Sequence, residues 1–462
     1  MLPPVFNDVT RRRFLQQLGF SAAGFLTTAI VGKQAYASFH KELNGNLAVR
    51  KNIAALAADD PSVKLLKDAV AILKKRSQKS PLDPTGWLAH VSQHATFCAT
   101  NLYENQVHYS WFLLPWHRGY LYSLEKKLQE AVREPKLALH YWDWTKNPAV
   151  PSHYWGIDNP MNNESRLIDP KDLIPNDFIN IGAALRTPDF ESFGGYPLVK
   201  NWDDQQRDGI AEQTFHNNLH NWIGGDMASF DNSGNDMIFT GHHGNVDRVW
   251  EAWLAIDAAH QNPGQNDWRE HTFYYTDAKG RPLDIKVKDL TNTEKLGYTF
   301  DNLNLNPVFC NPLLENDCPA MIETDQHTKI TATVLPSTGH KIFNNSGSNK
   351  YVRGQLHFER IELPYMPYCA RVFFSYRDGD MYGAPNVQKY VGTFTILPIG
   401  KPYAGVLQKE VFFQIELDAG YANRLKNIEQ VVVTLVPVAL RNRSIPEDTI
   451  RLHSVKLQLN RS

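Results

Sequence analysis

Apolar and polar positions follow different periods in the two halves of this chain. Up to about residue 305, apolar residues recur every three or four positions, as in helices that bury one face. Five stretches show this period: 54–76, 87–100, the run that follows Pro115, 213–222 and 244–255. Pro115 suits the first turn of a helix, where its missing N–H costs no hydrogen bond. The pattern predicts a mainly α region built from these helices.

In the second half the period becomes that of strands. Short runs alternate apolar and polar residues, with β-branched and aromatic residues enriched. These runs are 355–363, 371–376, 390–397, 411–417 and 431–436. Regularly spaced short strands are typical of a β-sandwich or a barrel, and we predict a C-terminal β-sandwich domain.

Two segments lack either period. Residues 148–205 are rich in Pro, Asn, Asp and Gly, which indicates a long irregular excursion within the helical region. Residues 337–350 are rich in Gly, Asn and Ser, which is typical of a linker. We therefore expect a catalytic domain over 38–305, a linker over 306–350 and a β domain over 351–462.

The first residues have the features of an export signal. The twin-arginine pattern Thr10-Arg11-Arg12-Arg13-Phe14-Leu15 precedes a mildly apolar run, 18–32, and the small-residue sequence 35–37. The apolar run is shorter than the roughly 20 residues that a membrane span needs. We expect 1–37 to be a twin-arginine signal peptide, removed on export to the periplasm or medium of a bacterium, with no membrane insertion after cleavage.

Composition excludes some partners. The 462 residues carry a formal net charge of −1, so no electrostatic attraction to nucleic acid or anionic membrane is expected. Of the four cysteines, Cys310, Cys318 and Cys369 leave several disulfide pairings open. Cys98 lies among histidines, and we expect it to have a role other than a disulfide.

Candidate chemistry is concentrated in histidines. They form two sets with metal-ligand spacing: His94, His108 and His117, and then His216, His220 and His242 or His243. Neutral imidazoles with no competing carboxylate favour copper or zinc over magnesium or calcium. Two such sites in one domain indicate a metal pair that acts on one small molecule.

Helix geometry supports convergence of these histidines but leaves two choices open. His216 and His220 are four apart, so they project from one helix face and can bind one ion. A four-helix bundle with inward histidines is a common way to build such a site. His90 shares a face with His94 and could be the ligand instead. Adjacent residues 242 and 243 cannot both point at one ion, and we expect the helix to begin at His243.

The histidine motifs and the residues around them resemble those of a known family. The chain is similar to the type-3 copper proteins, and within them to plant-type polyphenol oxidases (tyrosinases and catechol oxidases), from about residue 80 to 305. The motifs are His94-x-x-x-Cys98, Val107-His108-x-Ser110-Trp111, Pro115-Trp116-His117-Arg118, Tyr141-Trp142-Asp143-Trp144, His216-Asn217-x-x-His220, Asp236-x-Ile238-Phe239 and His242-His243-x-Asn245. The sequences 390–394 and 431–437 resemble the β domain of that family.

The resemblance implies a ligand set. His94, His108 and His117 would bind one copper, and His216, His220 and His243 the other. His242 would lie beside the ligands, and His90 outside the motif. Cys98 matches a cysteine that forms a thioether in many members, here to His108; a buried thiol is the alternative.

The resemblance also implies roles around the two copper ions. Glu212 and Asn217 would hold a water that removes the proton of a phenol, whose free pKa is near 10. Phe230 would stack over the substrate ring, and Asn221 lies where members vary. The β domain would cover the site and insert one side chain, for which Met381 and Tyr382 are the candidates.

Two departures from the plant pattern stand out. Cysteines expected before Cys98 for an N-terminal disulfide are missing, and a Tyr-x-Tyr motif is replaced by Tyr298-Thr299-Phe300. The second change is expected to alter a hydrogen bond between the domains.

The function expected from these features is oxidation of phenols by O2. The leading hypothesis is a secreted polyphenol oxidase that hydroxylates monophenols and oxidises o-diphenols to o-quinones, with phenolic small molecules and O2 as partners. A catechol oxidase without hydroxylation is the nearest alternative. A haemocyanin-like oxygen carrier has the same copper pair. A di-zinc hydrolase would normally include bridging carboxylates, which the histidine sets lack.

Overall fold

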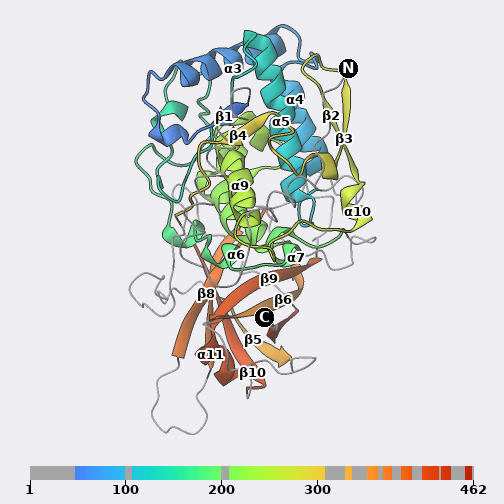
Figure 1. Ribbon diagram of the computed structural model, residues 1–462. Helices are drawn as coiled ribbons and strands as arrows, with labels where there is room; N and C mark the ends of the chain where they lie inside the picture. The colour runs from blue at the N-terminus through green and yellow to red at the C-terminus, as the bar shows by residue number, and fades with distance from the viewer. Residues whose placement is uncertain are drawn as a thin grey trace, which may run out of the picture. The chain divides into compact units, whose positions relative to one another are not determined.

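The protein is described from a computed structural model (Figure 1). The described residues are 47–98, 107–198, 208–306, 328–335, 351–362, 368–376, 387–397, 408–425, 428–438 and 453–459. Val49–Ser462 form one compact unit, which contains the predicted metal ligands and the C-terminal strands. The predicted signal peptide 1–37, the cysteines Cys310 and Cys318, and the candidate plug residues Met381 and Tyr382 lie outside the described residues.

The helical region contains four long helices and many short ones. The long helices are α3 (Pro61–Lys79), α4 (Trp87–Cys98), α5 (Leu113–Val132) and α9 (Ile238–Leu254). The shorter ones are η1 (Ile53–Ala55), η2 (Ser152–Tyr154), η3 (Asn176–Phe178), α6 (Gly182–Leu185), α7 (Phe190–Gly194), η4 (Glu212–His216), α8 (Asn217–Ile223), η5 (Gly225–Ala228), η6 (Ser233–Asn235), α10 (Asn266–Arg269) and η7 (Val287–Asp289). Short strands complete the region: β1 (Ala48–Arg50), β2 (Thr272–Thr276), β3 (Pro282–Lys286) and β4 (Tyr298–Phe300).

Local sequence explains where the surface helix α3 begins and which face it buries. The Asp60 side chain accepts a hydrogen bond from the Ser62 N–H, and Pro61 occupies the first helical position. Val63, Leu66, Val70 and Leu73 are buried along one face. Helix α9 is instead buried nearly all round, as expected of a central helix.

Helices α5 and α9 are joined by a buried ionic cluster. Arg118 on α5 donates through Nε to Asp247 Oδ1 on α9 at 2.6 Å. The other oxygen of Asp247 accepts from Arg50 at 3.1 Å and from the Tyr298 hydroxyl at 2.6 Å. Breaking a buried, hydrogen-bonded charge cluster is strongly destabilising because it leaves an uncompensated charge. The cluster therefore fixes the relative positions of the two helices that carry His117 and His243.

The prediction of a mainly helical region is confirmed, with two corrections. Helix α9 begins at Ile238, so His243 lies inside it and not at its start. The apolar period over 213–222 corresponds to two elements, the π-helical turn η4 and the α-helix α8. Single π turns occur frequently at functional sites, and periodicity alone does not reveal them. The regular four-helix bundle stays a prediction.

The C-terminal region is strand-rich, as predicted. Its strands are β5 (Thr328–Leu335), β6 (Tyr351–Glu362), β7 (Tyr368–Tyr376), β8 (Val387–Ile396), β9 (Gln408–Asp418), β10 (Gln430–Pro437) and β11 (Ser454–Leu459), with the short helix α11 (Ala419–Leu425). They form one sheet in the order β8-β7-β10-β5-β11-β6-β9, antiparallel except where β11 pairs with β5.

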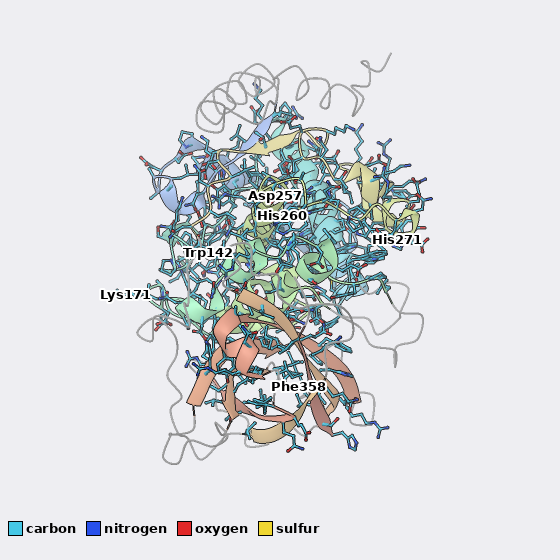
Figure 2. All side chains as sticks on the ribbon, turned by 60° about the horizontal axis from the view of Figure 1, so that its bottom comes forward. Trp142, Lys171, Asp257, His260, His271 and Phe358 are labelled. Carbon is cyan, nitrogen blue, oxygen red and sulfur yellow. The ribbon has the colours of Figure 1, made fainter. Side chains whose placement is uncertain are left out.

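This topology corrects the predicted sandwich. The described strands make a single seven-stranded sheet, and its two edges approach each other, because a Cβ on Gly392 of β8 would lie 2.9 Å from the Phe413 ring of β9. A sheet that curls on itself and two stacked sheets require the same alternation of apolar residues, so the sequence does not separate them. Figure 2 shows Phe358 inside this sheet, where it is fully buried.

The predicted linker 306–350 also needs correction. Strand β5 lies within it and pairs with both β10 and β11, so 328–335 belongs to the sheet. From Lys329 to Val334 this run alternates polar and apolar residues, so the period of a strand is present in its sequence. The Gly- and Ser-rich part of the predicted linker lies outside the described residues.

Candidate metal centre

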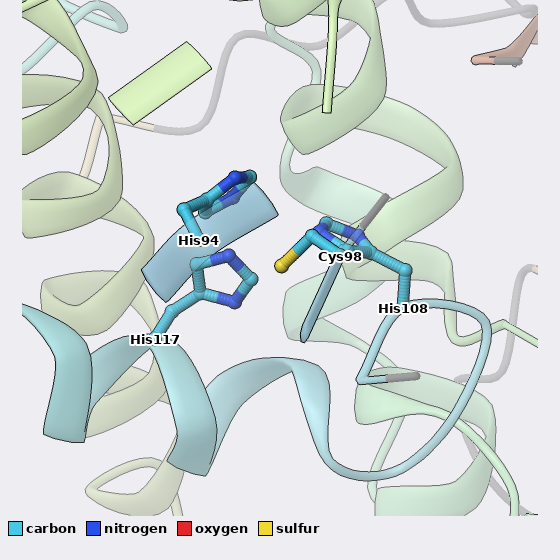
Figure 3. Close-up of side chains that lie close together, drawn as sticks. All are labelled: His94, Cys98, His108 and His117. Carbon is cyan, nitrogen blue, oxygen red and sulfur yellow. The ribbon is translucent and has the colours of Figure 1, made fainter. Parts of the chain in front are cut away.

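Three helical and loop segments bring the first histidine set together. His94 lies on α4 and His117 on α5, whereas His108 lies in the turn that precedes α5. Potential ligand atoms of these three residues and of Cys98 all lie within 4.8 Å of one another (Figure 3). All four side chains are buried. The first predicted site is therefore assembled in the structure.

The second set is carried by consecutive helical turns and by α9. Ligand atoms of His216, His220, His242 and His243 lie within 4.8 Å of one another. Nε2 of His220 is 3.0 Å from Nε2 of His243. Two ring nitrogens that converge so closely are placed to share one metal ion as ligands.

The two sets adjoin each other. The rings of His117 and His243, one from each set, are stacked with centroids 4.3 Å apart and planes inclined by 14°. The rings of His108 and His216 are 5.4 Å apart. The geometry therefore suits two ions close enough to act on one small molecule.

In three of the six predicted ligands the Nδ1 atom lies against a backbone carbonyl. His94 Nδ1 is 2.9 Å from Phe230 O, and His117 Nδ1 is 2.8 Å from Leu113 O. His220 Nδ1 is 2.6 Å from Met227 O. A hydrogen bond at Nδ1 sets the tautomer and leaves Nε2 as the electron-pair donor. Nε2 of His94, His117 and His216 has no hydrogen-bond partner among the described residues.

His108 and His216 are held by side chains instead. His108 Nδ1 is 2.9 Å from Glu212 Oε1, and the Glu212 carboxylate also accepts from the Tyr109 N–H at 3.0 and 2.9 Å. His216 Nδ1 is 2.9 Å from Asn217 Oδ1. Glu212 and Asn217, predicted to act together on a water, are thus each in contact with a predicted ligand.

Burial keeps the imidazoles neutral. It lowers the pKa of His94 to about 3 and that of His220 to about 4. Burial is also the largest cause that places the pKa of His117, His216, His242 and His243 well below the usual value. Because a metal ion binds the deprotonated ring, the site is prepared for an ion near neutral pH.

The donor set fits copper. All six predicted ligands are imidazoles, and Glu212, the one carboxylate that lies with His108 and His216, is hydrogen-bonded to His108 and to Tyr109. Nitrogen donors without bridging carboxylates suit copper or zinc.

The structure bears on two open choices of ligand, between His90 and His94 and between His242 and His243. His90 belongs to neither histidine group, and its ring stacks on Tyr120 at 3.9 Å. His242 and His243 both belong to the second group, so the choice between them still depends on the resemblance.

Aromatic side chains enclose the site. The Phe230 ring lies 4.5 Å from His108, consistent with its predicted place near the substrate. The Phe239 ring stacks on His243 at 4.0 Å. Asn221 is buried directly after His220. Phe239 lies four residues before His243, so helical spacing could have indicated this contact.

Two contacts of the site were not indicated by the sequence. The Tyr109 hydroxyl donates to Leu397 O, directly after β8, at 2.8 Å. Tyr298, the first residue of the altered Tyr-x-Tyr motif, binds Asp247, whereas the Phe300 ring packs against Tyr141. Both hydrogen bonds join residues far apart in sequence, and no short motif announces them.

Two models of known protein families match the part of the chain that contains this centre. The profile described as the common central domain of tyrosinase matches residues 84–188 and 158–256, which include all six predicted ligands. Residues 84–256 are thus similar to a tyrosinase-family domain. Polyphenol oxidase middle domain is the description of a second profile, which matches 262–312. Over these residues the chain resembles the plant polyphenol oxidases.

Similar proteins of known sequence include several plant enzymes. The chain is 24% identical over 450 residues to the latent form of polyphenol oxidase from Prunus armeniaca, covering 85% of this chain and 73% of the relative. It is 31% identical to a polyphenol oxidase of Vitis vinifera, covering 48% and 42%. It is 27% identical to (+)-larreatricin hydroxylase of Larrea tridentata, covering 54% and 49%. The chain thus spans about half the length of the last two.

Solved structures show the same fold. Latent apple tyrosinase superposes with a TM-score of 0.68 at 19% identity, covering 90% of this chain and 97% of that one. Grenache polyphenol oxidase from Vitis vinifera gives 0.51 at 27% identity, covering 56% and 85%. A functional unit of octopus haemocyanin gives 0.54 at 18% identity, covering 88% and 99%. The fold is therefore shared by a tyrosinase, a polyphenol oxidase and a haemocyanin unit.

Two expectations, a bacterial origin and export through the twin-arginine pathway, are not supported by these relatives. All three relatives of known sequence are plant proteins described as chloroplastic. Among the described residues no helix has the length and apolar character needed to cross a membrane.

Proposed function

We propose that this protein is a copper-dependent polyphenol oxidase that binds two copper ions between its two histidine sets. The observation that carries the proposal is the stacked pair His117 and His243, which joins two groups of buried, neutral imidazoles. His94, His108 and His117 hold one ion, and His216, His220 and His243 hold the other. Bound copper would supply the redox chemistry by which O2 oxidises a phenol. The chain binds the ions, positions the substrate and removes its proton.

The substrate ring lies against Phe230, whose position beside His108 supports this assignment. Asn221 adds a polar group next to His220 that can select among ring substituents. Buried aromatic walls exclude water and favour flat aromatic substrates.

Deprotonation of a monophenol is assigned to a water held by Glu212 and Asn217. Both residues belong to the segment 212–217, so they approach the site from the same side. Their contacts with His108 and His216 leave further acceptor positions on the carboxylate and amide oxygens. Such a water moves the phenol proton away from the metal ions.

Monophenol hydroxylation separates this proposal from a catechol oxidase. The copper-loaded chain is supplied with tyramine or L-tyrosine and no added catechol, before and after limited proteolysis, and oxygen uptake is followed. Uptake supports the polyphenol oxidase. Oxidation of catechols alone supports the diphenolase, and reversible O2 binding without turnover supports the oxygen carrier, whose fold is similar.

A thioether between Cys98 and His108 is part of the proposal. The Cys98 sulfur lies within 4.8 Å of a ring nitrogen of His108, and His108 is the predicted ligand that lies outside the helices. A covalent link would fix the ring in place of a helix. Peptide mass spectrometry tests it, since a thioether joins two peptides with loss of two hydrogens.

We propose also that the C-terminal domain shields the site and that its removal raises activity. The Tyr109–Leu397 contact supports this arrangement, as does a hydrogen bond from the Gln414 N–H of β9 to Gln213 Oε1 at 2.8 Å. The catalytic domain is assigned to 38–305, and the shielding domain to 351–462 together with β5. Met381 and Tyr382 remain candidates for the side chain that enters the pocket.

Export through the twin-arginine pathway is the proposal for localisation. Arg11, Arg12 and Arg13 with the following apolar run support it. A fusion of 1–37 to a reporter that folds before export, compared with a variant in which all three arginines are replaced by lysine, tests it. Loss of export in the variant is the expected result, and equal export contradicts it.

A further inference from the structure

The turn that carries His108 has an unusual backbone. Tyr109 has a φ of +59°, in the left-handed region that residues with a side chain rarely adopt. Among the described non-glycine residues this value is shared with Arg133, which ends α5, and with Arg360, which lies at the irregular pairing within β6. A helix end and a strand irregularity are common places for such a φ. Tyr109 occupies neither.

Two anchors explain why Tyr109 adopts this conformation. Its N–H donates to both oxygens of Glu212, at 3.0 and 2.9 Å. Its hydroxyl donates to Leu397 O at 2.8 Å, and its ring packs edge-on to Phe230. Rotation about φ sets the direction of the side chain relative to the N–H, so both anchors are reached together at the left-handed value. Strain of this kind persists where surrounding contacts impose it.

The first anchor continues to a predicted ligand. Glu212 Oε1, which accepts from Tyr109, also accepts from His108 Nδ1 at 2.9 Å. Glu212, His108 and Tyr109 are all buried. A continuous chain of contacts therefore runs from the residue after β8, through Tyr109 and Glu212, to the ring of His108.

We propose that Tyr109 is a positioning residue that links the C-terminal sheet to His108, through its hydroxyl at Leu397 and its backbone N–H at Glu212. The proposal rests on the proposed function, because it takes His108 as a copper ligand. The hydroxyl holds the end of β8 near the site, and the left-handed turn holds the carboxylate that orients His108. The two roles are carried by different groups of one residue, so different substitutions separate them.

The hydroxyl is tested by Tyr109→Phe in the full chain. Removal of one neutral hydrogen bond lowers the equilibrium constant for contact between the end of β8 and the Tyr109 turn by about fivefold. Because substrate then competes with a weaker contact, KM for 4-methylcatechol falls by a similar factor, with a smaller change in kcat. Tyr274→Phe, on the exposed β2 tyrosine, is the matched control and changes neither value. An unchanged KM in Tyr109→Phe overturns the role of the hydroxyl.

The backbone is tested by Tyr109→Ala against Tyr109→Gly. Both remove the hydroxyl and the ring, but glycine adopts a positive φ without steric cost, whereas alanine does not. Alanine therefore lets the turn relax and displaces Glu212 and His108, lowering kcat by about tenfold, and glycine restores most of that loss. Copper content and thermal unfolding are measured for each variant. If the alanine variant loses copper and the glycine variant retains it, the backbone role is also supported.

Equal kcat and equal copper content in the two variants overturn the backbone role. Failure of the proposed function is a distinct outcome, visible in the unsubstituted chain as an absence of bound copper and of catechol oxidation. A chain that binds copper and oxidises catechol, with no difference among the three Tyr109 variants, contradicts only this inference.

Discussion

The two histidine sets differ in what holds their ligands. In the second set, His216 and His220 lie on successive helical turns, and His243 lies within α9. In the first set, His94 and His117 also lie on helices, but His108 lies in a turn. Backbone carbonyls lie against Nδ1 of His117 and His220, whereas side chains lie against Nδ1 of His108 and His216.

For His108 those side chains come from distant parts of the chain. Glu212 binds its Nδ1, Tyr109 holds Glu212 in turn, and Cys98 lies beside it. His216 has a single side-chain partner, its own neighbour Asn217. The comparison indicates that the His108 ring depends on a residue distant in sequence, whereas the His216 ring depends on its neighbour in the same helical segment.

The largest expected effect comes from removing one ligand of each set. His117→Gln and His243→Gln should each lower catechol oxidation by more than about a hundredfold, beyond the range of outer-shell changes. Both sets act together, so either loss disables the pair. His90→Gln is the matched control, because His90 is buried nearby but belongs to neither group. Copper loss in the control with retention in His243→Gln would contradict the ligand assignment.

A smaller loss of copper affinity is expected when a residue that holds a ligand is replaced, and it should be larger at Glu212, which contacts His108, than at Asn217, which contacts His216. Glu212→Gln should weaken copper binding by about 10- to 100-fold, because the amide presents a donor to the His108 ring or to the Tyr109 N–H. Asn217→Ala should weaken it by less than about tenfold, since the helix still holds His216. Copper titration against a competing chelator measures both. Equal losses would show that the two sets are held alike.

Acid is expected to destabilise the copper-free protein through both sets. The folded pKa values of His94 and His220 lie at about 3 and 4, below the unfolded value of about 6.5. The unfolded chain therefore binds more protons below pH 6.5, and the free energy of unfolding falls as pH decreases toward 4. The two residues together contribute on the order of 5 kcal/mol to that fall.

Urea unfolding at pH 7, 6, 5 and 4 measures this dependence. The copper-loaded protein is the comparison, and its stability should hold to lower pH because the metal ions compete with protons for the rings. A free energy of unfolding that is constant from pH 7 to 4 in the copper-free protein would contradict the neutral, buried state of these histidines.

The smallest effect on copper is expected from the C-terminal sheet. Phe358→Ala removes a fully buried ring from the sheet core and should destabilise that region by about 3–5 kcal/mol. Copper content should stay within experimental error, since no predicted ligand comes from the sheet. Thermal unfolding with metal analysis checks both statements, and copper loss without unfolding would show that the sheet helps to build the site.

Much of the helical region and of the metal centre could be predicted because the signals are local. The apolar period of α4 and α5 and the spacing of His216 and His220 depend on neighbours within a few residues. The contacts that complete the site are not local. His108 and Glu212 are 104 residues apart, and Tyr109 and Leu397 are 288 apart, so no spacing rule connects them.

The strand-rich region shows the same limit. Alternation of apolar residues predicted the long strand β6, but strand order and the closure of the sheet depend on pairing between distant segments. Strand β5 lies centrally in the sheet although its sequence was interpreted as part of a linker. The choice between two sheets and one curled sheet is made by these long-range pairings and leaves no mark in the pattern of a single strand.

The most direct test of the central claim is metal analysis of the purified chain combined with electron paramagnetic resonance in air. The account predicts about two copper ions per chain, coupled so closely that they give little Cu(II) signal. Zinc in place of copper, about one copper per chain, or a signal that accounts for all the copper as separate Cu(II) ions would contradict it.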